Sequence, residues 1–238
     1  MFHKRNLFQE KFLTMFSGCL LLIAMFFVGK EAAEYVAGKN VRVQAPCIVI
    51  DAGHGGEDPG KVGINKVLEK DINLQIALRV KAYLEQNDIH VVMTRETDKG
   101  LNDSAVSNKK VQDMKRRIEI IEQAAPILTV SVHQNSYPEE YVHGAQVFYY
   151  NGSKEGERLA DSIQQQLVRK ADRENKRQIK ANNSYYLLKK TGTPIVIVEC
   201  GFLSNREEAK KLCTEEYQDK IAWAIHMGIL QYLAENEN

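Results

Sequence analysis

Short apolar runs rich in β-branched residues alternate with longer stretches of helical period from about residue 46 onwards. The run CIVID at Cys47–Asp51 is almost continuously apolar, which is typical of a strand that is covered on both faces. In the stretches between such runs, apolar residues recur at spacings of three and four, as on one face of a helix. This order of elements predicts an α/β fold, a single three-layer domain in which helices cover both faces of a sheet.

The apolar runs predict six strands. They are Cys47–Asp51, Ile89–Thr94, Ile127–His133, Gly144–Tyr150, Tyr185–Lys189 and Pro194–Glu199. The clearest helix is expected from about Glu69 to Gln86, because its apolar residues recur at helical spacing. Ser204, with Glu207 three residues later, predicts a capping box at the start of a short helix after the last strand.

A 17-residue apolar run, Phe12–Val28, follows a basic cluster at the N-terminus. A helix of this length spans roughly 25 Å, which is short for a bilayer and long for the core of a signal peptide. Residues 26–31, at the end of the run, offer no good pair of small side chains for a cleavage site, which favours an uncleaved anchor over a signal peptide. The basic flank argues against a buried helix of the domain. We expect a signal peptide or membrane anchor at 1–28, a linker at 29–45 and the folded domain at 46–238.

The charge distribution bears on location and partners. The positive flank of the apolar run predicts a cytoplasmic N-terminus and an extracytoplasmic domain, membrane-anchored or secreted, with the membrane as a partner of the N-terminal helix. Beyond residue 30 the chain holds 28 basic and 30 acidic residues. A body so close to neutral lacks the positive surface that binds phosphates, so no nucleic acid is expected as a partner.

Three predicted strands end in, or lead into, a residue that can bind a metal or move a proton. The first leads into His54, which has glycines on both sides, the third ends in His133, and the last ends in Glu199. Ligands of open α/β sheets bind beyond the carboxyl ends of the strands, so these side chains can converge although they are far apart in the sequence. Glu69 opens the helix after the glycine-rich loop and is near enough to His54 to share the site.

Two imidazoles, one carboxylate and a water are a ligand set of catalytic zinc. A second carboxylate can then serve as a base, and these groups suffice for hydrolysis of an amide. Each signal alone is weak, because a histidine at a strand end is more often a hydrogen-bonded structural residue and the chain has no short metal motif such as HExxH. The residues by themselves leave the zinc hypothesis and the structural alternative open.

Four segments resemble, in order and separation, the zinc-dependent N-acetylmuramoyl-L-alanine amidases of bacterial cell-wall metabolism, the amidase-3 family. They are IDAGHGGEDPG at Ile50–Gly60, LEKDINL at Leu68–Leu74, SVHQNS at Ser131–Ser136 and VECGFLSN at Val198–Asn205. The resemblance covers the whole body of the chain. It implies a mostly parallel sheet of about six strands, one Zn²⁺ ion held by His54, Glu69 and His133, and Glu199 as the catalytic glutamate.

The reaction that the resemblance implies is hydrolysis of the amide between the lactyl group of N-acetylmuramic acid and the L-alanine of the stem peptide. Peptidoglycan glycan strands with stem peptides are the implied partner. Two rivals remain: a zinc peptidase that cuts within the stem peptide, and a non-catalytic protein that binds peptidoglycan or recruits a partner. Product identity separates the first rival from the amidase, and turnover separates the second.

The small size, the N-terminal apolar run and the segment from Glu216 resemble the germination-specific members of the family in spore formers. This implies action in the forespore envelope on cortex peptidoglycan during sporulation, where removal of stem peptides precedes formation of the muramic-δ-lactam needed for germination. Because the ligands come from distant segments, we also expect the metal to be held weakly until substrate or an accessory envelope protein orders the loops.

Residues beside the predicted site have plainer alternatives. Asn135 is expected either to hydrogen-bond substrate or to fix its loop, and Asp51 either to orient His54 or to cap the turn. Cys200 adjoins Glu199, but alternation along a strand sends it to the opposite face, so we expect a packing residue rather than the nucleophile of a thiol hydrolase. The remaining histidines of the body are expected to be structural. They are His90, His143 and His226.

Overall fold

The computed structural model describes residues 15–18, 20–31, 46–103 and 105–236. The chain divides into one unit up to Gln44 and a second from Ala45 to the C-terminus. In the first unit, residues 15–18 and 20–31 are helical. None of the helices in the described ranges combines the length and the apolar character that a bilayer span requires. The rest of the predicted leader at 1–28, and residues 32–45 of the predicted linker, lie outside the described residues.

The second unit is built on a six-stranded sheet in the order β2-β1-β3-β6-β4-β5. The strands are β1 (Cys47–Ala52), β2 (His90–Met93), β3 (Leu128–Asn135), β4 (Gln146–Tyr150), β5 (Lys180–Asn182) and β6 (Ile195–Phe202). Strands β2, β1, β3 and β6 pair in parallel, while β4 is antiparallel to β6 and parallel to β5. The predicted α/β fold with a mostly parallel sheet is confirmed.

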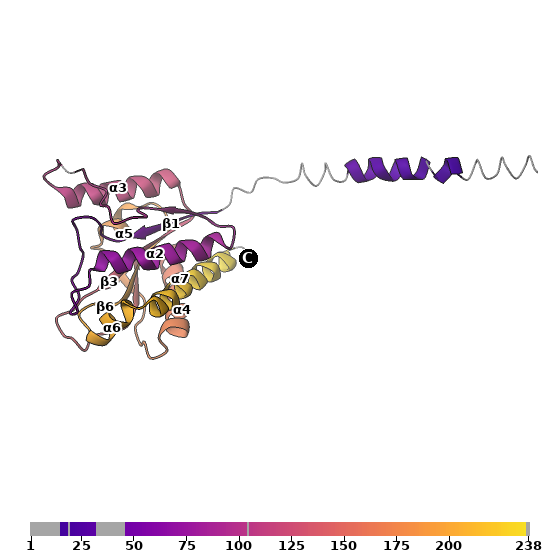
Figure 1. Ribbon diagram of the computed structural model, residues 1–238. Coiled ribbons are helices and arrows are strands. Elements are labelled where there is room, and N and C mark those ends of the chain that lie inside the picture. Colours follow the sequence, from indigo (N-terminus) through magenta and orange to yellow (C-terminus); the bar gives the residue numbers. More distant parts are fainter. Residues whose placement is uncertain (1–14, 19, 32–45, 104, 237–238) are drawn as a thin grey trace, which may run out of the picture. The chain divides into compact units, whose positions relative to one another are not determined.

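Helices cover both faces of this sheet (Figure 1). They are α2 (Glu69–Glu85), α3 (Lys109–Ala124), α4 (Lys154–Gln166), α5 (Tyr186–Lys190), α6 (Arg206–Leu212) and α7 (Glu215–Asn236), with a π-helical turn at Leu167–Ala171 after α4. Helices α2, α4 and α7 pack on one face, and α3 and α5 pack on the other.

The continuous apolar runs follow from this double cover. In β1, Ile48 and Ile50 belong to the core under α2 and α7, whereas Val49 belongs to the smaller core under α3 and α5. All three side chains are fully buried. A strand with one face in water would alternate apolar and polar residues, so the sequence pattern already indicates the three-layer arrangement.

One predicted strand is wrong. Tyr185–Lys189 is not a strand; it corresponds to helix α5, and the strand before it is the three-residue β5. The Asn182 side chain accepts hydrogen bonds from the backbone N–H groups of Ser184 and Tyr185, which ends β5 and turns the chain into α5. Both Leu187 and Leu188 are buried in the helix, and so short an apolar run has no period that separates a helix from a strand.

The start of the helix after the last strand is displaced by one residue from the prediction. Helix α6 is capped by Asn205, whose side chain accepts a hydrogen bond from the Glu208 N–H. The Ser204 hydroxyl instead accepts one from the backbone N–H of Tyr137 and so ties the loop after β3 to the end of β6. The predicted capping box at Ser204 and Glu207 is therefore wrong, although the helix that it predicted is present.

Candidate active site

His54 lies in the turn that follows β1. Its backbone has a φ of 61°, and Gly55 and Gly56 also have positive φ values. The ring Nδ1 lies 2.9 Å from the Asp58 Oδ2 atom. With the Asp58 carboxylate at Nδ1, Nε2 is the ring nitrogen that faces Glu69. Asp58 therefore orients the imidazole.

His133 is brought to the same place by the third strand and by a close approach of Gly53. A Cβ atom at residue 53 would lie 2.3 Å from Cε1 and 2.4 Å from Nε2 of the His133 ring. Only glycine leaves room for the ring at this position. The glycine at residue 60, with a φ of 67°, likewise makes room for the Glu69 carboxylate, which would lie 2.6 Å from an added Cβ.

Glu69 is the first residue of α2 and is 2% exposed. Its Oε1 accepts hydrogen bonds from the Gln134 N–H and the Asn73 amide, and its Oε2 accepts one from the Lys61 N–H. Burial alone would favour the neutral acid, but hydrogen bonds from His133 and His54 outweigh it and hold the pKa of Glu69 well below its usual range. Glu69 is thus a buried, ionised carboxylate.

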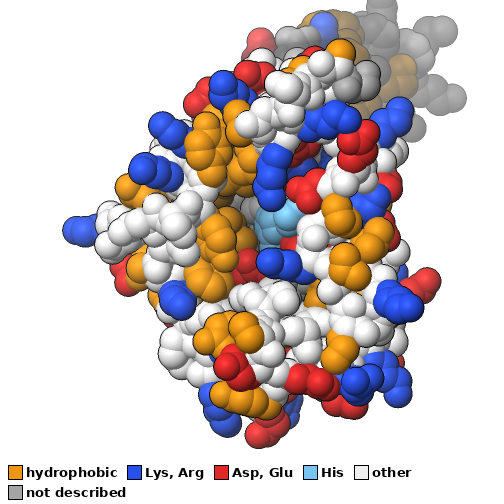
Figure 2. Space-filling model, turned by 90° about the vertical axis from the view of Figure 1, so that its left-hand side faces the viewer, with side chains coloured by type: hydrophobic (Ala, Val, Ile, Leu, Met, Phe, Trp, Pro, Cys, Tyr) orange, Lys and Arg blue, Asp and Glu red, His pale blue; other side chains and the backbone are white. Residues whose placement is uncertain are grey.

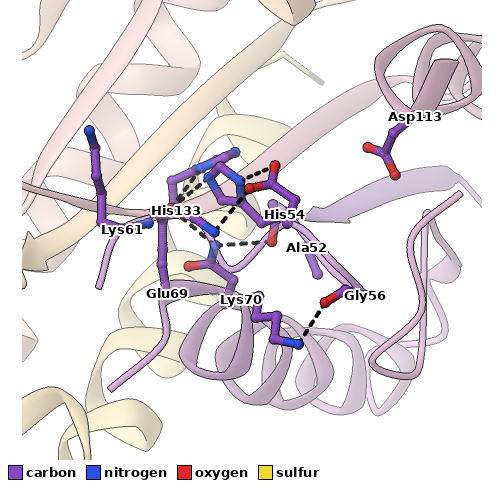
Figure 3. A network of polar contacts seen from close by, with 12 residues as sticks. Ala52, His54, Gly56, Lys61, Glu69, Lys70, Asp113 and His133 are labelled. Atoms are coloured by element: carbon purple, nitrogen blue, oxygen red, sulfur yellow. Dashed lines mark hydrogen bonds and ion pairs between the residues drawn. The ribbon is translucent and has the colours of Figure 1, made fainter. Parts of the chain in front are cut away.

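The three side chains converge from the turn after β1, from α2 and from β3, and Figure 3 shows them pointing toward one another. The Glu69 Oε1 atom lies 3.2 Å from His54 Nε2 and 3.0 Å from His133 Nδ1. One potential ligand atom from each residue lies within 4.8 Å of the other two. Two imidazoles and a carboxylate whose nitrogen and oxygen atoms converge in this way form a donor set that fits a zinc ion, and the glycines at 53 and 60 leave the space that the side chains need.

Glu199 lies beside this group without being part of it. In the parallel pairing of β3 and β6 its Cα is the partner of His133, which places both side chains on the face covered by α3 and α5. The side chain is buried, and burial raises the pKa of Glu199 to about 7 although the nearby His133 opposes the shift. A carboxyl group with such a pKa is suited to accept and return a proton near neutral pH.

A cleft gives access to these groups. His54, His133 and Glu199 line it, together with apolar side chains of α3, α5 and β6, namely Met114, Leu187 and Ile197. Figure 2 shows the hollow in this face with a pale-blue histidine at its floor and basic side chains around it. The cleft is open to solvent.

Asp51 fills neither of its two predicted roles. Its carboxylate accepts hydrogen bonds from the Thr94 and Ser131 hydroxyls and pairs with Arg117 at 2.5 Å. Burial opposes its ionisation, but Arg117 and the two hydroxyls outweigh it and lower the pKa of Asp51 to about 2. The buried Arg117 in turn donates to the His54 carbonyl, so Asp51 acts on the His54 turn only through this guanidinium.

Asn135 remains a prediction as a substrate-binding residue. Strand β3 continues to Asn135, but its register with β6 shifts after His133, so that Asn135 pairs with Phe202. The Asn135 side chain accepts a hydrogen bond from the Ser136 N–H, and its backbone carbonyl accepts one from Leu203. These contacts fit the plainer alternative, a residue that fixes the loop.

Cys200 is fully buried on the opposite face of β6, as strand alternation predicts. Burial raises the pKa of its thiol well above the usual range, which makes it a poor nucleophile. His226 is also buried, with its Nε2 3.0 Å from the Asn87 amide, and His143 contacts the Tyr141 carbonyl. Both fit the structural role expected of them.

Several residues that shape the site were missed from the sequence. They are Asp58, Asn73, Arg95, Arg117, Gln134 and Tyr185. Asp58 stands in the glycine-rich segment four residues after His54, which is a signal that local reading could have used. Arg117 lies 63 residues from His54 on an amphipathic helix, where a charged residue normally faces solvent, so no local signal marks it.

An α/β domain with this donor set beyond the ends of its parallel strands, and a second carboxylate beside it, has the make-up of a metallohydrolase. The chain belongs to the N-acetylmuramoyl-L-alanine amidase family Amidase_3, whose model matches residues 48–231.

The relatives agree with this assignment. Over 228 residues the chain is 36% identical to the germination-specific N-acetylmuramoyl-L-alanine amidase of Bacillus subtilis (strain 168), in an alignment that covers 94% of this chain and 95% of the relative. The solved CwlD amidase from Clostridioides difficile, in complex with the GerS lipoprotein, is 40% identical with a TM-score of 0.78, and the match covers 80% of this chain and 99% of that one. The amidase AmiC2 of Nostoc punctiforme is 35% identical with a TM-score of 0.70, covering 79% and 97%. The predicted family and enzyme class are confirmed.

Proposed function

We propose that this chain is a zinc-dependent amidase that releases stem peptides from peptidoglycan, with His54, Glu69 and His133 as the zinc ligands and Glu199 as the base. The observation that carries the proposal is the convergence of the three donor residues within 4.8 Å, with the carboxyl of Glu199 beside them on the neighbouring strand. A zinc ion held there would supply Lewis acidity, polarising the scissile carbonyl and acidifying water.

The protein side chains carry the proton transfers. Glu199 takes a proton from the attacking water and passes it to the leaving nitrogen of L-alanine as the amide bond breaks. Its pKa of about 7 suits both halves of this transfer. Asp58 fixes the His54 ring, and the buried Glu69 keeps its charge because of the hydrogen bonds around it.

The test compares the full-length wild type with the Glu199→Gln variant on purified muropeptides. We expect the substitution to lower turnover by at least about 10²-fold, the usual scale of general base catalysis, with bound zinc unchanged because the ligands stay intact. Mass spectrometry of the products shows which bond opens and so separates the amidase from a peptidase that cuts within the stem. Turnover that survives the substitution would refute the role given to Glu199.

The zinc ligands are tested by His133→Ala, with His143→Ala as the matched control. His143 contacts the Tyr141 carbonyl and belongs to none of the donor groups found among the described residues. Metal analysis should find zinc lost from the first variant and retained in the second. Equal zinc content in both variants would exclude His133 as a ligand.

We further propose that the substrate is cortex peptidoglycan of the forespore, in the route to muramic-δ-lactam. Two relatives support this: the germination-specific amidase of Bacillus subtilis and the CwlD amidase of Clostridioides difficile. Spores of a strain that lacks this protein should have no muramic-δ-lactam in their cortex. A reintroduced gene should restore the lactam only if it encodes Glu199. Normal lactam content in the deletion strain would refute cortex peptidoglycan as the substrate.

The domain borders and the location are proposals of the same kind: a leader or anchor at 1–28, a linker at 29–45 and the catalytic domain at 46–238, placed outside the cytoplasm. Cell fractionation with and without residues 1–28 tests the anchor. Because the Clostridioides difficile relative was solved with a lipoprotein, we also propose an accessory envelope protein for this chain. Zinc titration of this chain with and without envelope extract fractions tests the accessory protein. Equal zinc affinity in all samples would refute it.

A further inference from the structure

The two carboxylate oxygens of Glu199 have different surroundings. The Tyr185 hydroxyl donates a hydrogen bond to Oε1 at 3.3 Å. Oε2 is buried and has no hydrogen-bond partner among the described residues. A buried polar atom without a partner is costly unless a ligand or water completes it, so Oε2 is the oxygen left for the reaction.

Tyr185 is held in place independently of Glu199. Its backbone N–H donates to the Asn182 side chain at 2.9 Å, and its carbonyl accepts from the Lys189 N–H as α5 begins. Its ring packs edge-on against Phe148 of β4, with centroids 5.5 Å apart. The phenol is therefore fixed by β4 and by the turn between β5 and α5, and it lines the cleft beside Glu199.

We propose that Tyr185 is a positioning residue of the amidase, holding Oε1 of Glu199 so that Oε2 alone faces the attacking water. The inference rests on the proposed role of Glu199 as the base. The terminal torsion of a glutamate is broad and twofold, so without a partner on one oxygen the carboxylate can turn away from the reacting atoms. A single hydrogen bond to Oε1 removes that freedom.

The proton balance of the step leaves the phenol unchanged. The water O–H bond breaks, the proton goes to Oε2, and the freed electron pair forms the bond to the carbonyl carbon. The proton then moves from Oε2 to the amide nitrogen as the carbon–nitrogen bond breaks. Burial, with the charge of Glu199 second, raises the pKa of Tyr185 well above its usual range, so the hydroxyl keeps its proton and remains a donor throughout.

The test is Tyr185→Phe in the full chain loaded with zinc, assayed on a purified muropeptide. Phenylalanine keeps the contact with Phe148 and removes only the hydroxyl. The matched control is Tyr149→Phe, which removes another tyrosine-to-glutamate hydrogen bond, the one to Glu157 at 3.0 Å on the surface. We expect kcat to fall about tenfold in the first variant, with KM and zinc content unchanged, and no change in the control.

A crystal structure of each zinc-loaded form supplies the second readout. The carboxylate of Glu199 should keep one orientation in the wild type and should turn or split into two conformers in Tyr185→Phe. A kcat within about twofold of wild type, a loss confined to KM or to zinc content, or an unmoved carboxylate would overturn the inference. A wild type that releases no stem peptide would instead refute the proposed function.

Discussion

His54 occupies the left-handed region of backbone space, with a φ of 61° that a histidine seldom adopts. The strain persists because neighbours hold the turn. Arg95 donates to the carbonyls of Ala52 and Gly53, and Arg117 donates to those of Ala52 and His54. Two buried guanidinium groups thus fix the backbone that carries an imidazole of the site, which is the pre-organisation that a ligand set needs.

The tight fit between Gly53 and His133 predicts the effect of one methyl group. Gly53→Ala would place a Cβ 2.3 Å from the His133 ring and must displace it. We expect zinc affinity to fall by about 10–100-fold, the range seen when groups that orient metal ligands are changed. Titration with a competing chelator measures it.

Gly192→Ala is the control for that experiment. A Cβ at residue 192 meets no atom within 4 Å, and the backbone φ there is not in the left-handed region. The control should bind zinc as the wild type does. If both variants bind alike, the Gly53 contact plays no part in placing His133.

At the scale of elements, the sequence predicted the long helix α2 correctly and failed at one short apolar segment. Helix α2 begins at Glu69 as expected, because 17 residues of helical period leave little ambiguity. The short segment from Tyr185 to Lys190 carries no such period. Its helical form was decided by the side chain of Asn182 and by burial of Leu187 and Leu188 against the sheet.

The cap of α6 gives a prediction at this scale that separates the sequence-based interpretation from the structure. Asn205 accepts the Glu208 N–H at the helix start, whereas the Ser204 hydroxyl is bonded to Tyr137 outside the helix. Asn205→Ala should lower the free energy of unfolding by about 1 kcal/mol, the usual value of a lost cap. Ser204→Ala should leave hydrogen-exchange protection within α6 unchanged. Loss of that protection in Ser204→Ala would show that Ser204, as the sequence predicted, caps the helix.

At the scale of the whole molecule, the site depends on the order of the strands. Strands β1, β3 and β6 are neighbours in the sheet although Cys47 and Phe202 lie far apart in the domain sequence. Their carboxyl ends meet at one edge, where His54, His133 and Glu199 come together. Fold stability and site geometry are therefore linked through the polar network under α3, in which Asp51 of β1 pairs with Arg117.

That pair predicts how stability changes with pH. The pKa of Asp51 is about 2 in the folded protein against an ordinary value of 3.8, so its ionised form stabilises the fold. The contribution, about 2 kcal/mol, is fully present above the unfolded pKa and is lost as pH falls from about 4 toward 2. Denaturant unfolding between about pH 7 and pH 2 measures it.

Asp51→Asn should be less stable at neutral pH by about 3–5 kcal/mol, because Arg117 loses a buried partner. The variant should also lose part of the acid sensitivity seen between about pH 4 and pH 2. Asp88→Asn, at an exposed turn, serves as the control and should keep the wild-type profile. If the Asp51 variant loses as much stability as the wild type between about pH 4 and pH 2, that loss comes from other carboxylates.

The amino-acid sequence was enough to predict the fold class, most of the strands and the family, and to single out the four residues for which metal and catalytic roles are proposed. Strand period, helix period and the residues at strand ends are local properties, so a short stretch of sequence is enough to predict them. The folded chain was needed to show that Asp58 orients His54, that Asp51 serves Arg117, that α5 is a helix, and that Tyr185 reaches one oxygen of Glu199. Most of these depend on which strands and helices become neighbours, and the α5 helix depends on burial against the sheet. Packing of the whole chain sets such contacts, so no short stretch of sequence contains them.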